Sequence, residues 1–161
     1  ASGTDKFTVD EVVKRVDLLL KHELKRHHCV LKIDLCIDKS TEIKGEVNNL
    51  VQVFDNIIIN AMHSYEGKNG VIELLIVRSG DNVEFTFKDF GKGIPKKVAD
   101  RLFKEMVTTK GKKGTGLGLY MSYATIKGRF SGNISFTTKE DCGTTFFISI
   151  PCITYSTQEA E

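Results

Sequence analysis

The stretch GVIELLIVRSGDNVEFTFKDF, residues 70–90, decides the fold. Two runs rich in apolar and β-branched residues flank Ser79-Gly80-Asp81-Asn82, and this pattern predicts a β-hairpin that turns at these four residues. We therefore expect a pair of antiparallel strands here. The segments on either side determine what packs on them.

Upstream of the hairpin, the sequence predicts two amphipathic helices, within residues 7–28 and 45–65, because apolar residues recur there at spacings of three and four. Between them, residues 29–38 alternate between apolar and polar side chains, which favours a strand. A short strand is expected near residues 42–44.

Downstream, we expect a short helix over residues 97–103, a loop rich in glycine and lysine over 104–115, and a helix over 117–127. Residues 132–152 are typical of a second hairpin. Helices interleaved with hairpin-paired strands predict a two-layer α/β sandwich, in which the three longer helices pack on one face of the sheet.

Composition and charge limit the function classes. The chain has 161 residues, which suits one domain, and its net charge of +2 gives no reason to expect nucleic acid or an anionic membrane as a partner. The sequence contains no apolar run of membrane-spanning length and no signal peptide. Four cysteines without a C-x-x-C pair favour reduced core or near-core thiols of a cytoplasmic domain, and membrane anchoring of a longer parent chain stays open.

Polar side chains follow one stripe of the second helix. Asn49, Asn56, Asn60 and His63 are separated by seven, four and three residues, which places them on one side, away from the apolar face. Asparagine is a mediocre helix former, and its amide oxygen is a suitable ligand for Mg²⁺. A solvated polar face explains the stripe equally well.

The motif KDFGKGIP, residues 88–95, follows the predicted hairpin. Asp89 ends the strand, where a buried carboxylate can accept hydrogen bonds from an exocyclic amine, and Gly91 and Gly93 permit close approach of the backbone. A simple turn is the commoner explanation of such a motif when it stands alone.

The motif GTGLGL, residues 114–119, opens a predicted helix, whose free amide groups and dipole attract phosphate. No strand directly precedes it, as a dinucleotide-binding fingerprint requires, and no G-K-[ST] ends it, as a P-loop requires. The lysines at positions 104, 110, 112 and 113 could pair with phosphate oxygens, although solvation explains each of them singly.

Taken together and in this order, these motifs resemble the GHKL (Bergerat) ATP-binding superfamily. Within it, LFKEMVTTKGKKGTGLGLYMS, residues 102–122, is similar to the lid and glycine boxes of bacterial sensor histidine kinases. The resemblance extends from about Phe7 to Pro151. It implies a domain over residues 7–152 with a mixed, largely antiparallel sheet and a mobile ATP lid, an expression remnant or linker over 1–6, and a flexible tail over 153–161.

The resemblance also implies MgATP as the ligand. Asn60 would coordinate the Mg²⁺ that bridges the phosphates, Asn56 would line the same site, and Lys110 would reach the phosphates from the lid. Asp89 would bind the adenine amino group, and Thr144 would lie near adenine. The remaining residues that the resemblance places at the nucleotide are His63, Gly91, Gly93, Ile94, Thr109, Gly114, Thr115, Gly116, Leu117 and Gly118.

One substitution bears on the reaction. Hydrolytic members of this superfamily carry Glu one turn before the metal-binding Asn, whereas this chain has Asn56, which cannot act as a base near neutral pH. The resemblance therefore implies a histidine kinase domain that delivers the γ-phosphoryl group to a His on a separate dimerisation and phosphoacceptor domain, which then passes it to a response regulator. His22 is interpreted as a helix-surface residue and not as the acceptor. Two alternatives stay open: an anti-sigma-type serine kinase, and an ATP-sensing or docking module with degenerate catalysis.

Overall fold

A five-stranded sheet forms one layer of the molecule in the computed structural model, which describes residues 5–107 and 118–155. In spatial order the strands are β2 (Cys29–Cys36), β4 (Gly70–Ser79), β5 (Asn82–Asp89), β7 (Gly143–Pro151) and β6 (Asn133–Lys139). Strands β2 and β4 are parallel, and the other neighbouring pairs are antiparallel. The sheet is thus mixed and largely antiparallel, as the sequence predicts.

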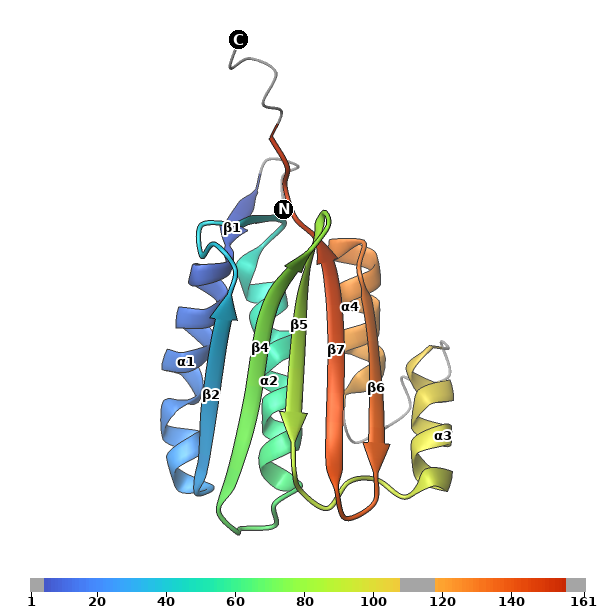
Figure 1. The fold of residues 1–161 in the computed structure, drawn as a ribbon. Coiled ribbons are helices and arrows are strands. Elements are labelled where there is room, and N and C mark those ends of the chain that lie inside the picture. Colours follow the sequence, from blue (N-terminus) through green and yellow to red (C-terminus); the bar gives the residue numbers. More distant parts are fainter. Residues whose placement is uncertain (1–4, 108–117, 156–161) are drawn as a thin grey trace.

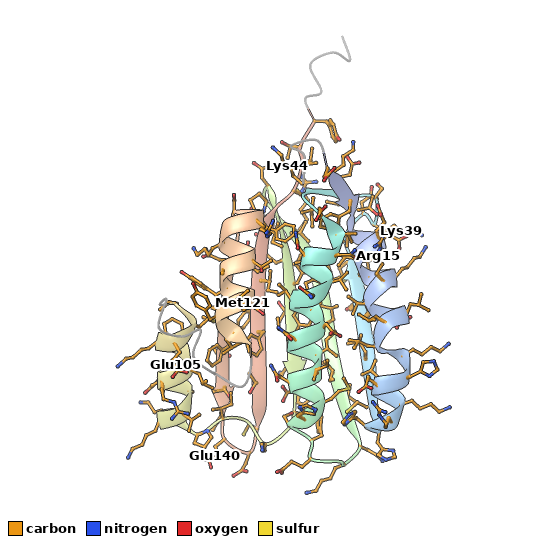
Figure 2. All side chains as sticks on the ribbon, turned by 180° about the vertical axis from the view of Figure 1, so that it is seen from behind. Arg15, Lys39, Lys44, Glu105, Met121 and Glu140 are labelled. Carbon is orange, nitrogen blue, oxygen red and sulfur yellow. The ribbon has the colours of Figure 1, made fainter. Side chains whose placement is uncertain are left out.

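Three helices form the second layer. Figure 1 shows α1 (Val9–Arg26), α2 (Val47–His63) and α4 (Leu119–Phe130) behind the sheet, with α2 in the middle, while α3 (Lys96–Met106) lies beyond the edge formed by β6. In Figure 2 the same three helices are seen from behind, side by side. This arrangement confirms the predicted two-layer α/β sandwich.

The two predicted hairpins are present. Strands β4 and β5 pair up to Ser79 and Asn82, so that the turn falls where the sequence places it. Strands β6 and β7 pair up to Lys139 and Gly143. Hairpins depend on local alternation and turn residues, which explains why their positions can be read from the sequence.

Helix α2 is fixed to the sheet by an aromatic cluster. Phe54 is fully buried, and its ring packs edge-to-face on Phe85 at 4.9 Å and on Phe87 at 4.8 Å between ring centroids. Such pairs add stability beyond the area that they bury. Because Asn56 and Asn60 lie on the same helix, this packing also sets the position of the polar stripe relative to β5.

The N-terminal segment contains a strand that the sequence analysis missed. Strand β1 (Lys6–Thr8) pairs with β3 (Glu42–Lys44), and Phe7 and Ile43 face each other in this pair, both buried. Thr8 then caps α1 in a capping box with Glu11. A three-residue strand is too short to show an alternating pattern, so the pairing becomes visible only in the structure.

Two helix boundaries differ from the prediction. Helix α3 continues to Met106 instead of ending at Phe103, because Leu102 and Met106 bury one face of an additional turn. Lys104 therefore lies in the last turn of a helix and not in the glycine-rich loop. Helix α4 begins at Leu119 and ends at Phe130, two to three residues later than expected at each end.

The cysteine interpretation is half correct. All four thiols are free, and Cys29 and Cys152 are buried as expected. Cys36 and Cys142 are instead exposed, because Cys36 alternates onto the uncovered face of β2 and Cys142 lies in the turn between β6 and β7. Among the described residues, no helix is long and apolar enough to cross a membrane.

Candidate functional site

A cavity of about 220 Å³ lies where the C-terminal end of α2 meets the loop after β5 and the first residues of β7. This is the lower end of the molecule in Figure 1. The cavity is lined by Asn60, Ala61, His63, Ser64, Asp89, Lys92, Gly93, Ile94, Thr144 and Phe146. Six of these were predicted site residues: Asn60, His63, Asp89, Gly93, Ile94 and Thr144.

Asp89 is the buried acid of this cavity, with only 6% of the residue exposed. Its Oδ1 accepts hydrogen bonds from the Gly91 amide at 3.0 Å, the Ser64 hydroxyl at 3.2 Å and the Thr144 amide at 3.3 Å. Burial raises the pKa of the Asp89 carboxyl above its ordinary value, and the three hydrogen bonds oppose that rise. Because these bonds all end on Oδ1, Oδ2 is the oxygen that can accept from a ligand.

Two glycines permit the close backbone contacts around Asp89. Gly93 has a φ of +64°, and a Cβ there would lie 2.0 Å from the Lys139 carbonyl oxygen. Gly143 has a φ of +123°, and a Cβ there would lie 2.1 Å from the Asp89 carbonyl oxygen. A side chain at either position would push the loop after β5 away from the hairpin of β6 and β7, and would open the cavity.

A threonine pair joins this loop to β7, and the sequence analysis missed one of its members. The Thr138 hydroxyl accepts a hydrogen bond from the Ile94 amide at 2.9 Å and lies 2.8 Å from the Thr144 hydroxyl. Thr138 and Thr144 are directly paired across the hairpin. The hairpin register could have revealed Thr138, because it places that residue opposite the predicted Thr144.

Two further residues near the cavity were not predicted as site residues. Lys92 lines the cavity between the two motif glycines, and its Nζ lies 3.4 Å from a carboxylate oxygen of Glu66. Tyr65 lies outside the cavity, where its hydroxyl accepts a hydrogen bond from the Phe90 amide at 2.8 Å. Tyr65 thus supports the loop from behind, through its hydrogen bond to the Phe90 amide.

The polar stripe of α2 is divided between two places. Asn60 and His63 line the cavity, and Asn56 lies against the start of α4, since a Cβ on Gly118 would be 2.9 Å from Asn56 Nδ2. Asn49 lies at the other end of the helix, in a separate cavity that includes Lys44 and Arg129. The helical spacing therefore predicts the shared face correctly, but only its lower half belongs to the site.

Helix α4 begins without a side-chain cap. Gly118 is its N-cap residue and has a left-handed backbone conformation with a φ of +67°. The first amide groups of a helix have no partners within the helix, and together with the dipole they favour an anion. The start of α4 therefore offers donors next to Asn56.

Six predicted site residues lie outside the described part of the chain: Thr109, Lys110, Gly114, Thr115, Gly116 and Leu117. Their proposed contacts with phosphate stay predictions.

Asp55 has no part in the cavity, although it precedes Asn56 in α2. Its Oδ1 is buried without a hydrogen-bond partner, and burial raises the pKa of this carboxyl. It is not among the residues that line the cavity.

The described residues contain no group of three or more His, Cys, Asp or Glu side chains that could hold a metal ion. The amide oxygen of Asn60 suits a different kind of cation site. Mg²⁺ is commonly held by one or two protein oxygens while phosphates and water supply its other ligands. The residues present therefore fit a Mg²⁺ that arrives with a polyphosphate.

Comparison with known proteins gives relatives of one kind. Sporulation kinase A of Bacillus subtilis (strain 168) is 40% identical over 112 residues, and the match covers 70% of this chain and 18% of that protein. Sensor histidine kinase DpiB of Escherichia coli (strain K12) is 37% identical over 116 residues, covering 70% of this chain and 20% of that protein. This chain thus spans about a fifth of the length of these curated relatives.

Solved structures show the same fold. The catalytic domain of histidine kinase ThkA in a nucleotide-free form superposes with a TM-score of 0.74 at 24% identity, covering 91% of this chain and 94% of that chain. ThkA in complex with the response regulator protein TrrA gives a TM-score of 0.73 at 20% identity, covering 91% of this chain and 41% of that chain.

A family model settles the classification. Residues 45–154 match the model described as histidine kinase-, DNA gyrase B-, and HSP90-like ATPase, and this range contains α2, the loop after β5, α4 and the hairpin of β6 and β7. Every predicted site residue falls within it. The chain therefore belongs to the histidine kinase-, DNA gyrase B- and HSP90-like ATPase family, and it is an ATP-binding domain of the histidine kinase type.

Proposed function

We propose that this chain is the catalytic domain of a sensor histidine kinase. It transfers the γ-phosphoryl group of MgATP to a histidine on a separate dimerisation and phosphoacceptor domain, from which the group passes to a response regulator. The named relatives support the kinase assignment. The complex of ThkA with a response regulator supports the choice of the final partner.

The observation that supports the proposal is that the described residues offer no free carboxylate as a base for water, either in the cavity or at position 56. Among the described residues that line it, Asp89 is the sole carboxylate, and its Oδ1 is occupied by two backbone amides and the Ser64 hydroxyl. At the position of the hydrolytic glutamate stands Asn56, whose amide has no basic lone pair near neutral pH. The site is thus suited to hold ATP for an external nucleophile.

Each side of the cavity has its own task in this proposal. Oδ2 of Asp89 accepts from the exocyclic amino group of adenine, and Thr144 completes this end. Asn60 and His63, in the last turn of α2, face the phosphates, and the N-terminus of α4, with the positive end of its dipole, faces them from the other side. Together these groups select adenine at one end and polyphosphate at the other.

The transfer needs little proton chemistry from this chain. A ring nitrogen of the neutral acceptor imidazole forms a bond to the γ-phosphorus, and the bond from that phosphorus to the bridging oxygen of ADP breaks, with ADP leaving. Asn60 would hold a Mg²⁺ that arrives with the phosphates, and this ion would supply positive charge to offset that of the transferred group. The contribution of the protein is to position ATP and to keep water from being activated.

Mixing experiments test this proposal. The purified chain is incubated with γ-labelled ATP, Mg²⁺ and separately purified dimerisation domains from relatives such as sporulation kinase A. We expect label in an acid-labile, alkali-stable form on the added domain, as phosphohistidine behaves, and its loss with Asn60→Ala.

Other results would select the alternatives. Acid-stable label on serine would favour a serine kinase, and release of inorganic phosphate without transfer would favour an ATPase. Tight MgATP binding without transfer to any acceptor domain would favour the ATP-sensing or docking module.

A further inference from the structure

Two imidazole rings connect the nucleotide cavity with the end of α1. His63 lines the cavity from the last turn of α2, and its ring centroid lies 5.5 Å from that of His27, with 58° between the ring planes. Nε2 of His27 lies 3.6 Å from Oε2 of Glu23, one turn earlier in α1. The three side chains thus form a row that begins outside the cavity and ends within it.

The row depends on how α1 and α2 lie together. The helices run side by side in Figure 2, and Arg15 donates a hydrogen bond to the Asn48 side chain at 3.0 Å near their N-terminal ends. Twelve residues further along α1 comes His27, which ends the helix through a bond from its backbone N–H to the Glu23 carbonyl at 3.0 Å. The backbone position of His27 is therefore fixed by the capped end of α1.

We propose that His27 is a positioning residue for His63, and that Glu23 in turn orients His27. This rests on the proposed function, in which polyphosphate lies at the His63 end of the cavity. His63 is exposed, so its ring would otherwise be free to turn towards solvent. Contact with the His27 ring holds it beside the cavity, where a ring N–H can donate to a phosphate oxygen.

Charge strengthens the same arrangement. A carboxylate beside Nε2 of His27 favours a proton on that nitrogen, and this selects one tautomer of the ring.

The other charges around His63 do not replace this row. Lys92 lines the cavity from the loop after β5 and is paired with Glu66, while Asp89 is held at the far side by its hydrogen bonds. Arg26 shares the Glu23 carboxylate through the other oxygen.

The test compares ligands that do and do not reach His63. Dissociation constants of ATP and AMP are measured by calorimetry for the unaltered chain and for His27→Ala. We expect His27→Ala to weaken the binding of ATP by about threefold to tenfold, as for the loss of a ring contact, and to leave the affinity for AMP unchanged. In a His63→Ala background, His27→Ala should have no further effect on either ligand.

Two additional variants separate ring contact from charge. His27→Phe retains an aromatic ring at this position, so it should recover ATP affinity. Glu23→Gln keeps the ring of His27 and removes the carboxylate beside it, so it should weaken ATP binding less than His27→Ala does. His22→Ala is the matched control, since His22 is exposed on the same helix and has no place in the row.

Failure of this inference is distinct from failure of the proposed function. Unchanged ATP affinity in His27→Ala, while Asp89→Asn binds ATP more weakly, would overturn the positioning role and leave the site intact. Equal weakening of ATP and AMP would also overturn it, since it would show that His27 only supports the fold. Absence of ATP binding by the unaltered chain would instead overturn the proposed function.

Discussion

At the scale of single residues, Asp89 shows how one carboxylate serves both structure and recognition. Oδ1 holds the loop after β5 and the start of β7 together, and Oδ2 is left for the ligand. Because the two oxygens have different partners, a substitution can keep the structural hydrogen bonds and still remove the bond to the ligand. An amide at this position can keep the structural bonds on its oxygen, but it presents a donor where the ligand needs an acceptor.

We therefore predict that the Asp89→Asn variant keeps its fold but binds ATP more weakly. The new Nδ2 would face the adenine amino group, donor against donor, and the lost charge-assisted bond should weaken ATP by about 10- to 100-fold. Calorimetric titration measures the affinity, and the urea midpoint at neutral pH reports the fold. Asp55→Asn is a useful control, because Asp55 lies outside the cavity. Unaltered ATP affinity in Asp89→Asn would show that adenine does not bind here.

The raised pKa of Asp89 also predicts how stability depends on pH. The folded state holds the proton of this buried carboxyl more tightly than the unfolded state does, so its contribution favours folding below the unfolded pKa of about 3.9 and is lost as pH rises through the folded value. Relative to the wild type, Asp89→Asn should gain stability as pH rises through this window. Urea unfolding of both proteins from acid to neutral pH measures the difference. A difference that is constant with pH would contradict the assigned shift.

At the scale of elements, the hairpin of β6 and β7 packs closely against the end of β5 and the loop after it. Gly143, the first residue of β7, allows the Asp89 carbonyl to approach within a distance that no side chain permits. Gly128 lies within α4, where a Cβ would meet nothing within 4 Å. The two glycines thus form a matched pair of test sites.

We predict opposite effects from the same substitution. Gly143→Ala should lower the free energy of unfolding by about 3 kcal/mol, because the φ at this position is strained for any other residue and the new Cβ would collide with backbone. Gly128→Ala should raise the free energy of unfolding by about 0.5–1 kcal/mol, because alanine loses less conformational freedom than glycine when a helix forms. Chemical unfolding measures both. Equal effects would show that the contact between Gly143 and Asp89 does not constrain the fold.

Elements with a local signal could be predicted from the sequence. Both hairpins and the three long helices follow from turn residues and apolar spacing, and the motif around Asp89 identified the loop of the site. Strand β1 was not predicted because it has three residues and its partner strand lies more than thirty residues away in the sequence. The end of α3 was misplaced because Met106 is buried by tertiary packing, which lysine-rich sequence around it does not indicate.

The sequence predicted the residues of the candidate site that belong to recognisable motifs. It did not predict the residues that other elements bring to the site in the folded chain. Thr138 and Ser64 belong to different elements, and each reaches the loop through a hydrogen bond that only the folded chain creates. Asn49 shares the periodicity of Asn60 but lies at the opposite end of α2. Periodicity identifies the face of a helix, whereas position along the helix depends on what packs against it.

At the scale of the whole molecule, ligand binding should stabilise the fold. ATP bridges α2, the loop after β5 and β7 in the proposed site, and it binds only when these are assembled. With MgATP at a hundred times its dissociation constant, the gain is about 2.7 kcal/mol, which corresponds to a rise of about 5–10 °C in the midpoint of thermal unfolding. Thermal scans with and without nucleotide measure it, and Asp89→Asn, with its weaker affinity, should gain only about 0.4–1.4 kcal/mol at the same concentration. A similar rise in that variant would indicate binding elsewhere.

The pairing of Asp89 with Thr144 has a consequence for folding kinetics. The hairpins can close locally, but the bond between these residues spans 55 positions and exists only after β5 has aligned with β7. Contacts of such long range carry the greatest entropic cost and are expected to form late. ATP should then slow unfolding in stopped-flow experiments and leave the refolding rate nearly unchanged, since the refolding barrier is crossed before the nucleotide has a place to bind. The lifetime of the folded domain would thereby depend on the ATP concentration around it.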